Sequence, residues 1–508
     1  MRRAHFAGRG GWYETVPCVG VRVSFPGLRL RRRGGGGTTA APAGAPQTVQ
    51  ASASVTFWAY DLTTKQPYQL TAKKVGEGSH CYVYLEDGSS VTLSAVPAIV
   101  SQYDSVIYPA MTAAFGAEPN PGVDNDPKVY ILLLKIRDGF TSNSSSYVAG
   151  FFDPSNEYLV SQYSYSNQRE MIYMNVNPQA GIDPQSTDFY GTIAHEFQHM
   201  IHWQQKTNLR NVHDDTWLDE GMATVAPTVC GYGPDYGRVA TYESAPSHSL
   251  TAWDDTIESY GVVYMWSQYL KDQLGAGIFR QMLQNSQTGI ASVNAALAAS
   301  GSSLDFATIF RNWTIANTSG NAVTWAGHPE WSYTSIDTHK GTFNGVYLPG
   351  LLDRATLNAT TLSALGPWSV GYYAYTTTQP TGTVTWTPKG TGEKASFINS
   401  GANGGAGALT YDLAANAATS FTTNGYLIDQ NPVGSATTTG DTVVHTSLAA
   451  AASVEPAAPA QILAAANAHP LVRSMSAQSG KPQHVCVDSY FREREKALRS
   501  QGIRPAFR

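Results

Sequence analysis

The chain has 508 residues, 42% of them hydrophobic and 11% aromatic, which is enough for two to four domains with apolar cores. Residues 1–33 carry eight arginines and one glutamate, so the formal net charge of −5 leaves −12 for the rest, and an acidic body argues against nucleic acid as the main partner. Charged residues make up only 14%, which we associate with secreted or envelope proteins, and no apolar run reaches the ~18 residues that a membrane-spanning helix needs.

The first 50 residues are expected to be a disordered leader and linker. They include basic residues but no apolar stretch behind them, so a secretory signal is not recognisable. Residues 34–42 have the composition of a flexible linker. Such glycine-rich linkers often follow the lipid-carrying cysteine of bacterial envelope lipoproteins, and Arg33 stands where that cysteine would be. We therefore expect residues 1–33 to be a misread or replaced leader.

Residues 51–125 are expected to form a β-rich N-terminal part. Strand-like patterns lie at residues 55–60 and 81–85, and a helix is expected at about 96–115. An acidic cluster follows at residues 124–127. It is compatible with a Ca²⁺ site, although a plain turn is the more common use of such residues.

The next region, residues 126–335, is expected to be the catalytic domain. Apolar, β-branched runs at residues 129–136 and 170–176 predict strands. A helix follows, which Ser186 or Thr187 can cap. Its apolar residues form one stripe, which consists of Phe189, Ile193, Phe197, Met200 and Ile201. Further helical patterns lie at residues 257–270, 279–283, 293–297 and 306–313.

The helix carries the motif His195-Glu196-x-x-His199 on the side opposite its apolar stripe. Histidines four residues apart on a helix point the same way, so their imidazoles can converge on one Zn²⁺. Glu196 lies about 100° around the helix and can act as general base towards water at the metal without being a ligand. A catalytic zinc also needs a third protein ligand, and Glu220, in the next helical pattern, is the candidate. His202 is expected to be a polar neighbour, because it lies about 10.5 Å of helical rise from His195.

The cysteines do not form a metal-binding pattern. Cys18, Cys81, Cys230 and Cys486 include no CxxC pair. A disulfide between Cys81 and Cys230 and two isolated buried thiols are both consistent with the sequence. A structural zinc site is disfavoured, since such sites are closed by four protein ligands, often cysteines, and no cysteine lies near the motif.

The C-terminal part changes character. Residues 340–445 are rich in Thr, Gly, Asn and Ala, with strand-like segments at 371–376 and 383–386, which predicts a β-sandwich-like module. Residues 446–508 are rich in Ala and Pro and then basic, and we expect a disordered tail there.

The motif HEFQHMI at residues 195–201 and the segment WLDEG at residues 217–221 resemble the hyicolysin family of bacterial metallopeptidases, which belongs to the gluzincins. The resemblance covers roughly residues 75–320, including residues 166–171. It implies an α+β, thermolysin-like gluzincin domain. It also implies one catalytic Zn²⁺ held by His195, His199 and Glu220, with Glu196 as the base, in a secreted or envelope endopeptidase.

The chain departs from related gluzincins at one point. Those proteins often carry a further acid four or seven residues after the third ligand, where this chain has Thr224 and Pro227. The acid that orients a ligand histidine must then come from elsewhere, and Asp219 and Glu243 are the candidates. The Gly-x-Met-Glu-Asn segment with which gluzincin aminopeptidases anchor a free amine is missing, which favours an endopeptidase.

Two further roles are assigned within this reading. Tyr260 is the candidate catalytic hydrogen-bond donor to the oxyanion, although a packing role is equally consistent. The strand at residues 171–176 is a candidate to bind the substrate backbone as an added strand.

The sequence therefore predicts a zinc-dependent endopeptidase that hydrolyses peptide bonds in extracellular proteins, with Glu196 as general base. The alternative is a secreted binding or adhesion protein that keeps a weakly active or inactive peptidase fold. The intact motif favours the enzyme. The expected partners are protein or peptide substrates, with no nucleic acid and no transmembrane segment.

Overall fold

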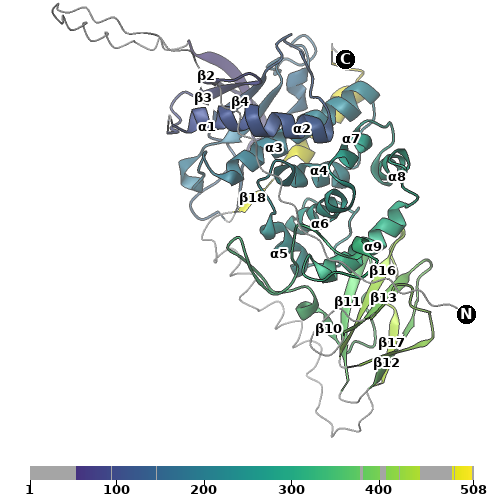
Figure 1. Ribbon diagram of the computed structural model, residues 1–508. Coiled ribbons are helices and arrows are strands. Elements are labelled where there is room, and N and C mark those ends of the chain that lie inside the picture. The colour runs from purple at the N-terminus through teal and green to yellow at the C-terminus, as the bar shows by residue number, and fades with distance from the viewer. Residues whose placement is uncertain are drawn as a thin grey trace, which may run out of the picture. The chain divides into compact units, whose positions relative to one another are not determined.

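The computed structural model describes residues 53–92, 94–144, 146–377, 381–400, 408–422, 424–446, 483–485 and 487–505 (Figure 1). These residues belong to one compact unit of mixed α and β structure. The expected leader and linker of residues 1–50 lie outside the described residues. No helix within the described ranges has the length and apolar character needed to cross a bilayer.

A six-stranded mixed sheet underlies the first half of the described chain, with the strand order β1-β2-β3-β4-β7-β6. Its strands are β1 (Val55–Asp61), β2 (Gln66–Glu77), β3 (Cys81–Glu86), β4 (Val129–Leu134), β6 (Gly150–Phe152) and β7 (Met171–Asn175). Strands β3, β4 and β7 are parallel to one another, and the outer pairs are antiparallel. The strands predicted in this region are therefore present. Because β3 pairs with β4, one sheet joins the expected N-terminal part to the expected catalytic domain, and no boundary lies near residue 125.

Strand β4 lies in the middle of this sheet and is buried along its whole length. Ile131 and Leu133 face the main core with the helices, whereas Leu132 and Leu134 face a second core on the other side of the sheet. Burial on both faces explains why the sequence there is a continuous apolar run rather than an alternating one.

The helices mostly match the expected ranges. They are α1 (Ala95–Gln102), a π-helical turn (Tyr103–Ile107), α2 (Tyr108–Phe115), α3 (Thr187–His202), a second π-helical turn (Trp203–Asn208), α4 (Thr216–Val229), α5 (Tyr236–Ser244), α6 (Ile257–Leu274), α7 (Gly277–Leu283), α8 (Gly289–Ala299) and α9 (Phe306–Ser319). Ser186 caps α3, because its Oγ accepts a hydrogen bond from the backbone N–H of Phe189 at 3.1 Å. The predicted apolar stripe of α3 is buried in the main core.

The C-terminal module consists of β-sheets, as its composition predicts. A hairpin of β8 (Gly341–Phe343) and β9 (Val346–Leu348) comes first. A five-stranded sheet contains β10 (Thr356–Leu357), β11 (Ser369–Thr376), β16 (Asn424–Asn431), β13 (Lys394–Ser400) and β14 (Ala408–Thr410), and a three-stranded sheet contains β15 (Ala418–Phe421), β12 (Gly382–Thr387) and β17 (Thr442–Thr446). Side chains of both sheets, among them Tyr375 and Trp386, share one core.

The expectation of a disordered C-terminal tail is wrong for the part of it that the structure describes. Strand β18 (Gln483–Val485) pairs in parallel with β5 (Ser146–Val148), and α12 (Asp488–Ser500) packs on β6. This segment, yellow in Figure 1, lies against the blue and teal elements of the first half of the chain.

The helix α12 is anchored by one apolar residue and several charged ones. Phe491 is fully buried in the second core, where its ring stacks on Phe151 with centroids 4.7 Å apart. Glu495 and Arg499 lie one and two turns further along the same face and are buried as well. A buried face with a single apolar residue lacks the hydrophobic periodicity of a helix. The hydrophobic pattern of the sequence therefore does not predict α12.

Candidate metal centre

Helices α3 and α4 bring the motif residues together. A Cβ added to Gly191 on α3 would lie 3.3 Å from the Pro227 ring on α4, so the glycine allows the two helices to approach closely. The Nε2 atoms of His195 and His199 are 3.2 Å apart. Oε2 of Glu220, on α4, lies 3.8 Å from the first of these nitrogens and 3.6 Å from the second.

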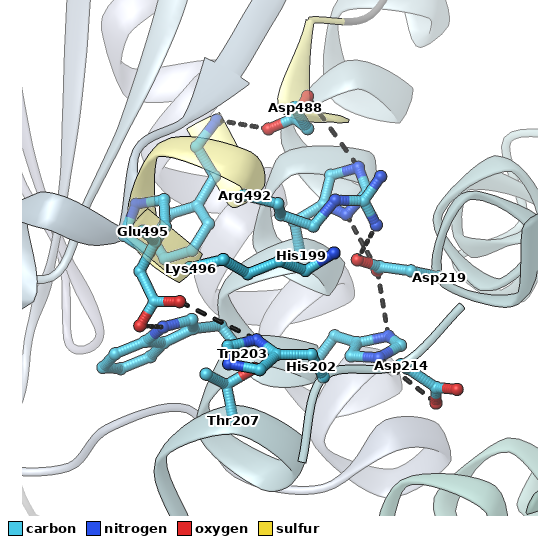
Figure 2. A pocket seen from close by; sticks show the side chains of 13 residues that line it. His199, His202, Trp203, Thr207, Asp214, Asp219, Asp488, Arg492, Glu495 and Lys496 are labelled. Carbon is cyan, nitrogen blue, oxygen red and sulfur yellow. Dashed lines mark hydrogen bonds and ion pairs between the residues drawn. The ribbon is translucent and has the colours of Figure 1, made fainter. Parts of the chain in front are cut away.

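A further acid joins these residues from the C-terminal segment. Oδ2 of Asp488 lies 3.8 Å from Nε2 of His199, and His195, His199 and Asp488 each offer a ligand atom within 4.8 Å of the others. Figure 2 shows Asp488 and Arg492, both from α12, close to His199. Sequence reasoning missed Asp488, because it lies in the expected tail and no local pattern marks it.

These residues fit a zinc ion. Zinc binds nitrogen and oxygen ligands at about 2.0–2.1 Å, and in a tetrahedron that bond length places the ligand atoms about 3.3–3.4 Å from one another. In the structure the two imidazole nitrogens are 3.2 Å apart, and Oε2 of Glu220 lies 3.6 and 3.8 Å from them. Imidazole and carboxylate are also ligands that zinc prefers.

Of the two candidate acids, Asp219 is the one that contacts His199. Its Oδ1 lies 3.0 Å from Nδ1 of His199 and 2.9 Å from Nδ1 of His202. Nε2 of His202 in turn lies 3.5 Å from Asp214. The other candidate acid, Glu243, instead accepts the backbone N–H of Gly350 at 3.0 Å. Asp219 rather than Glu243 therefore lies beside His199, and His202 is a polar neighbour of Asp219; a role of Asp219 in orienting a metal ligand stays a prediction.

The centre concentrates negative charge in a buried place. Burial alone lowers the pKa of His199, but the carboxylates of Asp488, Asp219 and Glu220 outweigh it and raise the pKa to about 9. Burial raises the pKa of Glu220 to about 7, against the opposing effects of His199 and Arg492. Burial also opposes the ionisation of Asp219, yet Arg492 and the two histidines hold its pKa well below the usual range. A divalent cation bound between the histidines and Glu220 would be attracted by the same carboxylates that raise the pKa of His199.

Glu196 lies beside this centre, under the edge of the sheet. It is only 2% exposed, and its Oε2 has no hydrogen-bond partner among the described residues. Burial and the nearby charges of Asp488 and Glu220 raise its pKa well above the ordinary value. A Cβ added to Gly150 on β6 would lie 3.1 Å from Cγ of Glu196, so this glycine lets the strand pass close to the carboxylate.

A cavity of about 530 Å³ opens on the His195 side of the centre. Its walls include His195, Glu196, Tyr232, Tyr236 and Arg238. The His195 side chain is 14% exposed, whereas His199 is 2% exposed. A substrate can therefore reach the centre from this cavity.

The structure does not bring Tyr260 to this cavity wall. Its ring packs edge-on against Trp253 at 4.8 Å, and the Arg238 guanidinium lies 4.9 Å from the ring centroid. Its role as a hydrogen-bond donor stays a prediction. The role suggested for residues 171–176 is wrong, because β7 is paired on both sides, with β4 and with β6, and has no edge for an added strand. The edge strand on this side of the sheet is β6.

The remaining sequence expectations concern cysteines and calcium. Cys81 and Cys230 are both free and buried, so they do not form the disulfide that the sequence allowed. In the acidic cluster, Asp124 accepts a hydrogen bond from the backbone N–H of Asp126, as in a turn. Calcium binding there stays a prediction. Glu157 interacts electrostatically with Asp124, and its two carboxylate oxygens are buried without a hydrogen-bond partner among the described residues, so it is a candidate ligand.

No family model matches the chain. The chain is 32% identical over 243 residues to the neutral metalloprotease ShpI of Staphylococcus hyicus, which covers 45% of this chain and 54% of that protein. The chain thus spans about half the length of the curated relative it matches. The similarity confirms the resemblance noted from the motifs, and over this stretch the chain is a distant relative of the hyicolysin-like metallopeptidases.

Proposed function

We propose that this protein is a zinc-dependent endopeptidase of the gluzincin type. In this proposal His195, His199 and Glu220 hold one Zn²⁺, and Glu196 is the general base. The observation that carries it is the convergence of the three ligand side chains at separations of 3.2–3.8 Å beside a cavity that a substrate can enter. The relationship to a neutral metalloprotease supports the same reaction class.

The residues of the chain divide the work of peptide hydrolysis among them. When bound, zinc would supply Lewis-acid chemistry, polarising the substrate carbonyl and acidifying water. Glu196 accepts a proton from the attacking water and returns it to the leaving amine. Asp219 holds His199 in one orientation through Nδ1, which fixes the direction of Nε2.

The donor to the developing oxyanion is proposed to be Tyr260, with Tyr232 and Tyr236 of the cavity wall as the alternatives. Replacing each of the three by phenylalanine separates them. Replacing the true donor should lower kcat by about 10²–10³-fold, whereas replacing either of the other two tyrosines should change kcat little.

Substrates are proposed to be extracellular proteins or peptides, and the protein is proposed to act outside the cell or at its envelope. An open cavity beside the centre is compatible with cleavage inside a chain. The paired sheets of the C-terminal module are proposed to form a sandwich.

The test compares zinc content and casein cleavage in the wild type, Glu196→Ala and Glu243→Gln. Glu243 is a matched control, since it is an equally buried glutamate outside the centre. We expect about one zinc in all three proteins and loss of cleavage in Glu196→Ala alone. A wild type that holds zinc but cleaves neither casein nor a peptide library would favour the binding-protein alternative.

A further inference from the structure

The C-terminal segment, meaning β18 and α12 with Val487 between them, contacts the six-stranded sheet at its edge strand β6, whereas β18 itself pairs with β5 in a separate two-stranded sheet. Gln483 pairs with Ser146 and Val485 with Val148, in a parallel arrangement. Further along, Oδ1 of Asp488 accepts the backbone N–H of Phe152 on β6 at 2.8 Å. Asp488 thus takes a backbone N–H of β6, the edge strand on which an extended substrate would add a strand.

Asp488 also stands at the metal centre. A catalytic zinc keeps one coordination position open for water or substrate, whereas four protein ligands close the site. With His195, His199 and Glu220 as three ligands, the carboxylate of Asp488, 3.8 Å from Nε2 of His199, is placed to take the fourth position.

Arg492, one turn further along α12, contacts the two acids that support the centre. It pairs with Asp219 and donates from Nη2 to Oε1 of Glu220 at 2.9 Å. These contacts leave Oε2 of Glu220 directed towards the histidines. The segment is therefore complementary in charge to the site, presenting a carboxylate to the metal position and a guanidinium to the surrounding carboxylates.

Contacts outside the centre keep the helix in place. Arg494 donates to Ser155 at 2.8 Å and to Tyr163 at 2.6 Å, and the Tyr158 hydroxyl donates to Glu495 at 2.6 Å. On the α12 side of His199 a hollow of only about 30 Å³ is left, space for about one water, whereas the His195 side opens into about 530 Å³. The segment thus fills the α12 side of the approach to the centre, where its Asp488, Arg492, Glu495 and Lys496 line the small hollow (Figure 2), and leaves the His195 side accessible.

We propose that this C-terminal segment is an intramolecular inhibitor of the peptidase, in which Asp488 acts as a removable fourth metal ligand and α12 excludes substrate from one half of the cleft. The proposal rests on the proposed function. It implies that full activity requires α12 to leave the site.

The test uses full-length protein whose intact C-terminus is verified by mass, as the wild type, Asp488→Asn, Arg492→Gln and the double variant. Glu493→Gln is the matched control, because Glu493 lies beside Arg492 but its side chain is 66% exposed and pairs with Lys496, away from the metal centre. Three quantities are measured: kcat/KM on an internally quenched peptide, the rate of zinc loss to a chelator, and hydrogen exchange of the backbone amides of α12.

We expect kcat/KM to rise about ten- to a hundredfold in the double variant and less in each single variant, with no change in the control, since each variant removes charge-assisted contacts. Zinc loss should be faster in Asp488→Asn, and the α12 amides should exchange faster in the double variant. A gain in activity cannot come from a folding defect. A synthetic peptide of residues 487–505 should inhibit the double variant, and the same peptide with Asp488→Asn should inhibit it less.

Two failures are distinguishable. If the wild type and all variants cleave equally, or the double variant is slower while keeping its zinc, the inhibitor proposal is overturned and the peptidase function stands. If none of them cleaves any peptide, the peptidase function fails. In that case, faster zinc loss from Asp488→Asn would identify Asp488 as a permanent fourth ligand of a structural zinc. Whether or not zinc loss is faster, a protein that cleaves no peptide overturns the inhibitor proposal as well.

Discussion

Asp219 offers a quantitative test of how the metal centre is supported. Its buried carboxylate contacts His199 at 3.0 Å and His202 at 2.9 Å and pairs with Arg492. Asp219→Asn keeps the shape of the side chain and removes its charge. Loss of a carboxylate behind a metal-bound histidine lowers metal affinity about 10–100-fold, which corresponds to about 1.4–2.7 kcal/mol. We expect the upper part of this range, because the same carboxylate also holds His202.

The assay is the zinc dissociation constant, measured by competition with a chromophoric chelator at one fixed pH. Glu243→Gln serves as the control, since the sequence alone made Glu243 an equal candidate for this role. The melting temperature of the metal-free proteins shows whether Asp219→Asn acts through the fold instead. An unchanged zinc affinity in Asp219→Asn, or an equal loss in Glu243→Gln, would refute the assignment.

Further predictions concern stability and packing. Burial raises the pKa of Glu243 from 4.5 to about 8, so the stability that its protonated form contributes is fully present below pH 4.5 and is lost as the pH rises through 8. Between these pH values the free energy of unfolding of the wild type should fall, relative to Glu243→Gln, by up to about 1.4 kcal/mol per pH unit. The same pH dependence of stability in both proteins would contradict this. Gly150→Ala places a Cβ 2.9 Å from the Tyr173 carbonyl oxygen and beside Glu196. We expect this variant to be destabilised by about 1–3 kcal/mol and to have a lower kcat while it keeps its zinc. An unaltered kcat would contradict the close packing of β6 on Glu196. The calcium hypothesis predicts a melting temperature that rises with added Ca²⁺ in the wild type but not in Glu157→Gln. If Ca²⁺ does not change the melting temperature of the wild type, residues 124–127 are a plain turn. Cys81 should react with thiol reagents only after unfolding, and labelling of the native protein would contradict its burial.

The parts of the fold that depend on local pattern were predictable. The spacing of His195 and His199 and the apolar stripe of α3 follow from one helical period, and Ser186 at its start is a local capping signal. The continuous apolar run of β4 indicated a strand buried on both faces.

The parts that depend on distant segments were not predictable. Asp488 meets His199 only because α12 returns to the sheet, and one phenylalanine among charged residues does not predict a docked helix. Asp219 and Glu243 are both acids downstream of the motif, and only the position of α5 removes Glu243 from the centre. The apolar run of β7 indicated a strand but could not show that β6 would cover its edge.

The most direct test of the zinc peptidase assignment is X-ray absorption at the zinc edge on the full-length protein, with metal content measured on the same sample. The assignment predicts about one zinc per chain, bound by two histidine nitrogens and by oxygen ligands at about 2.0–2.1 Å, and loss of this signal in a His199→Ala variant. A protein that takes up no zinc, or one whose zinc is bound by sulfur, would contradict it.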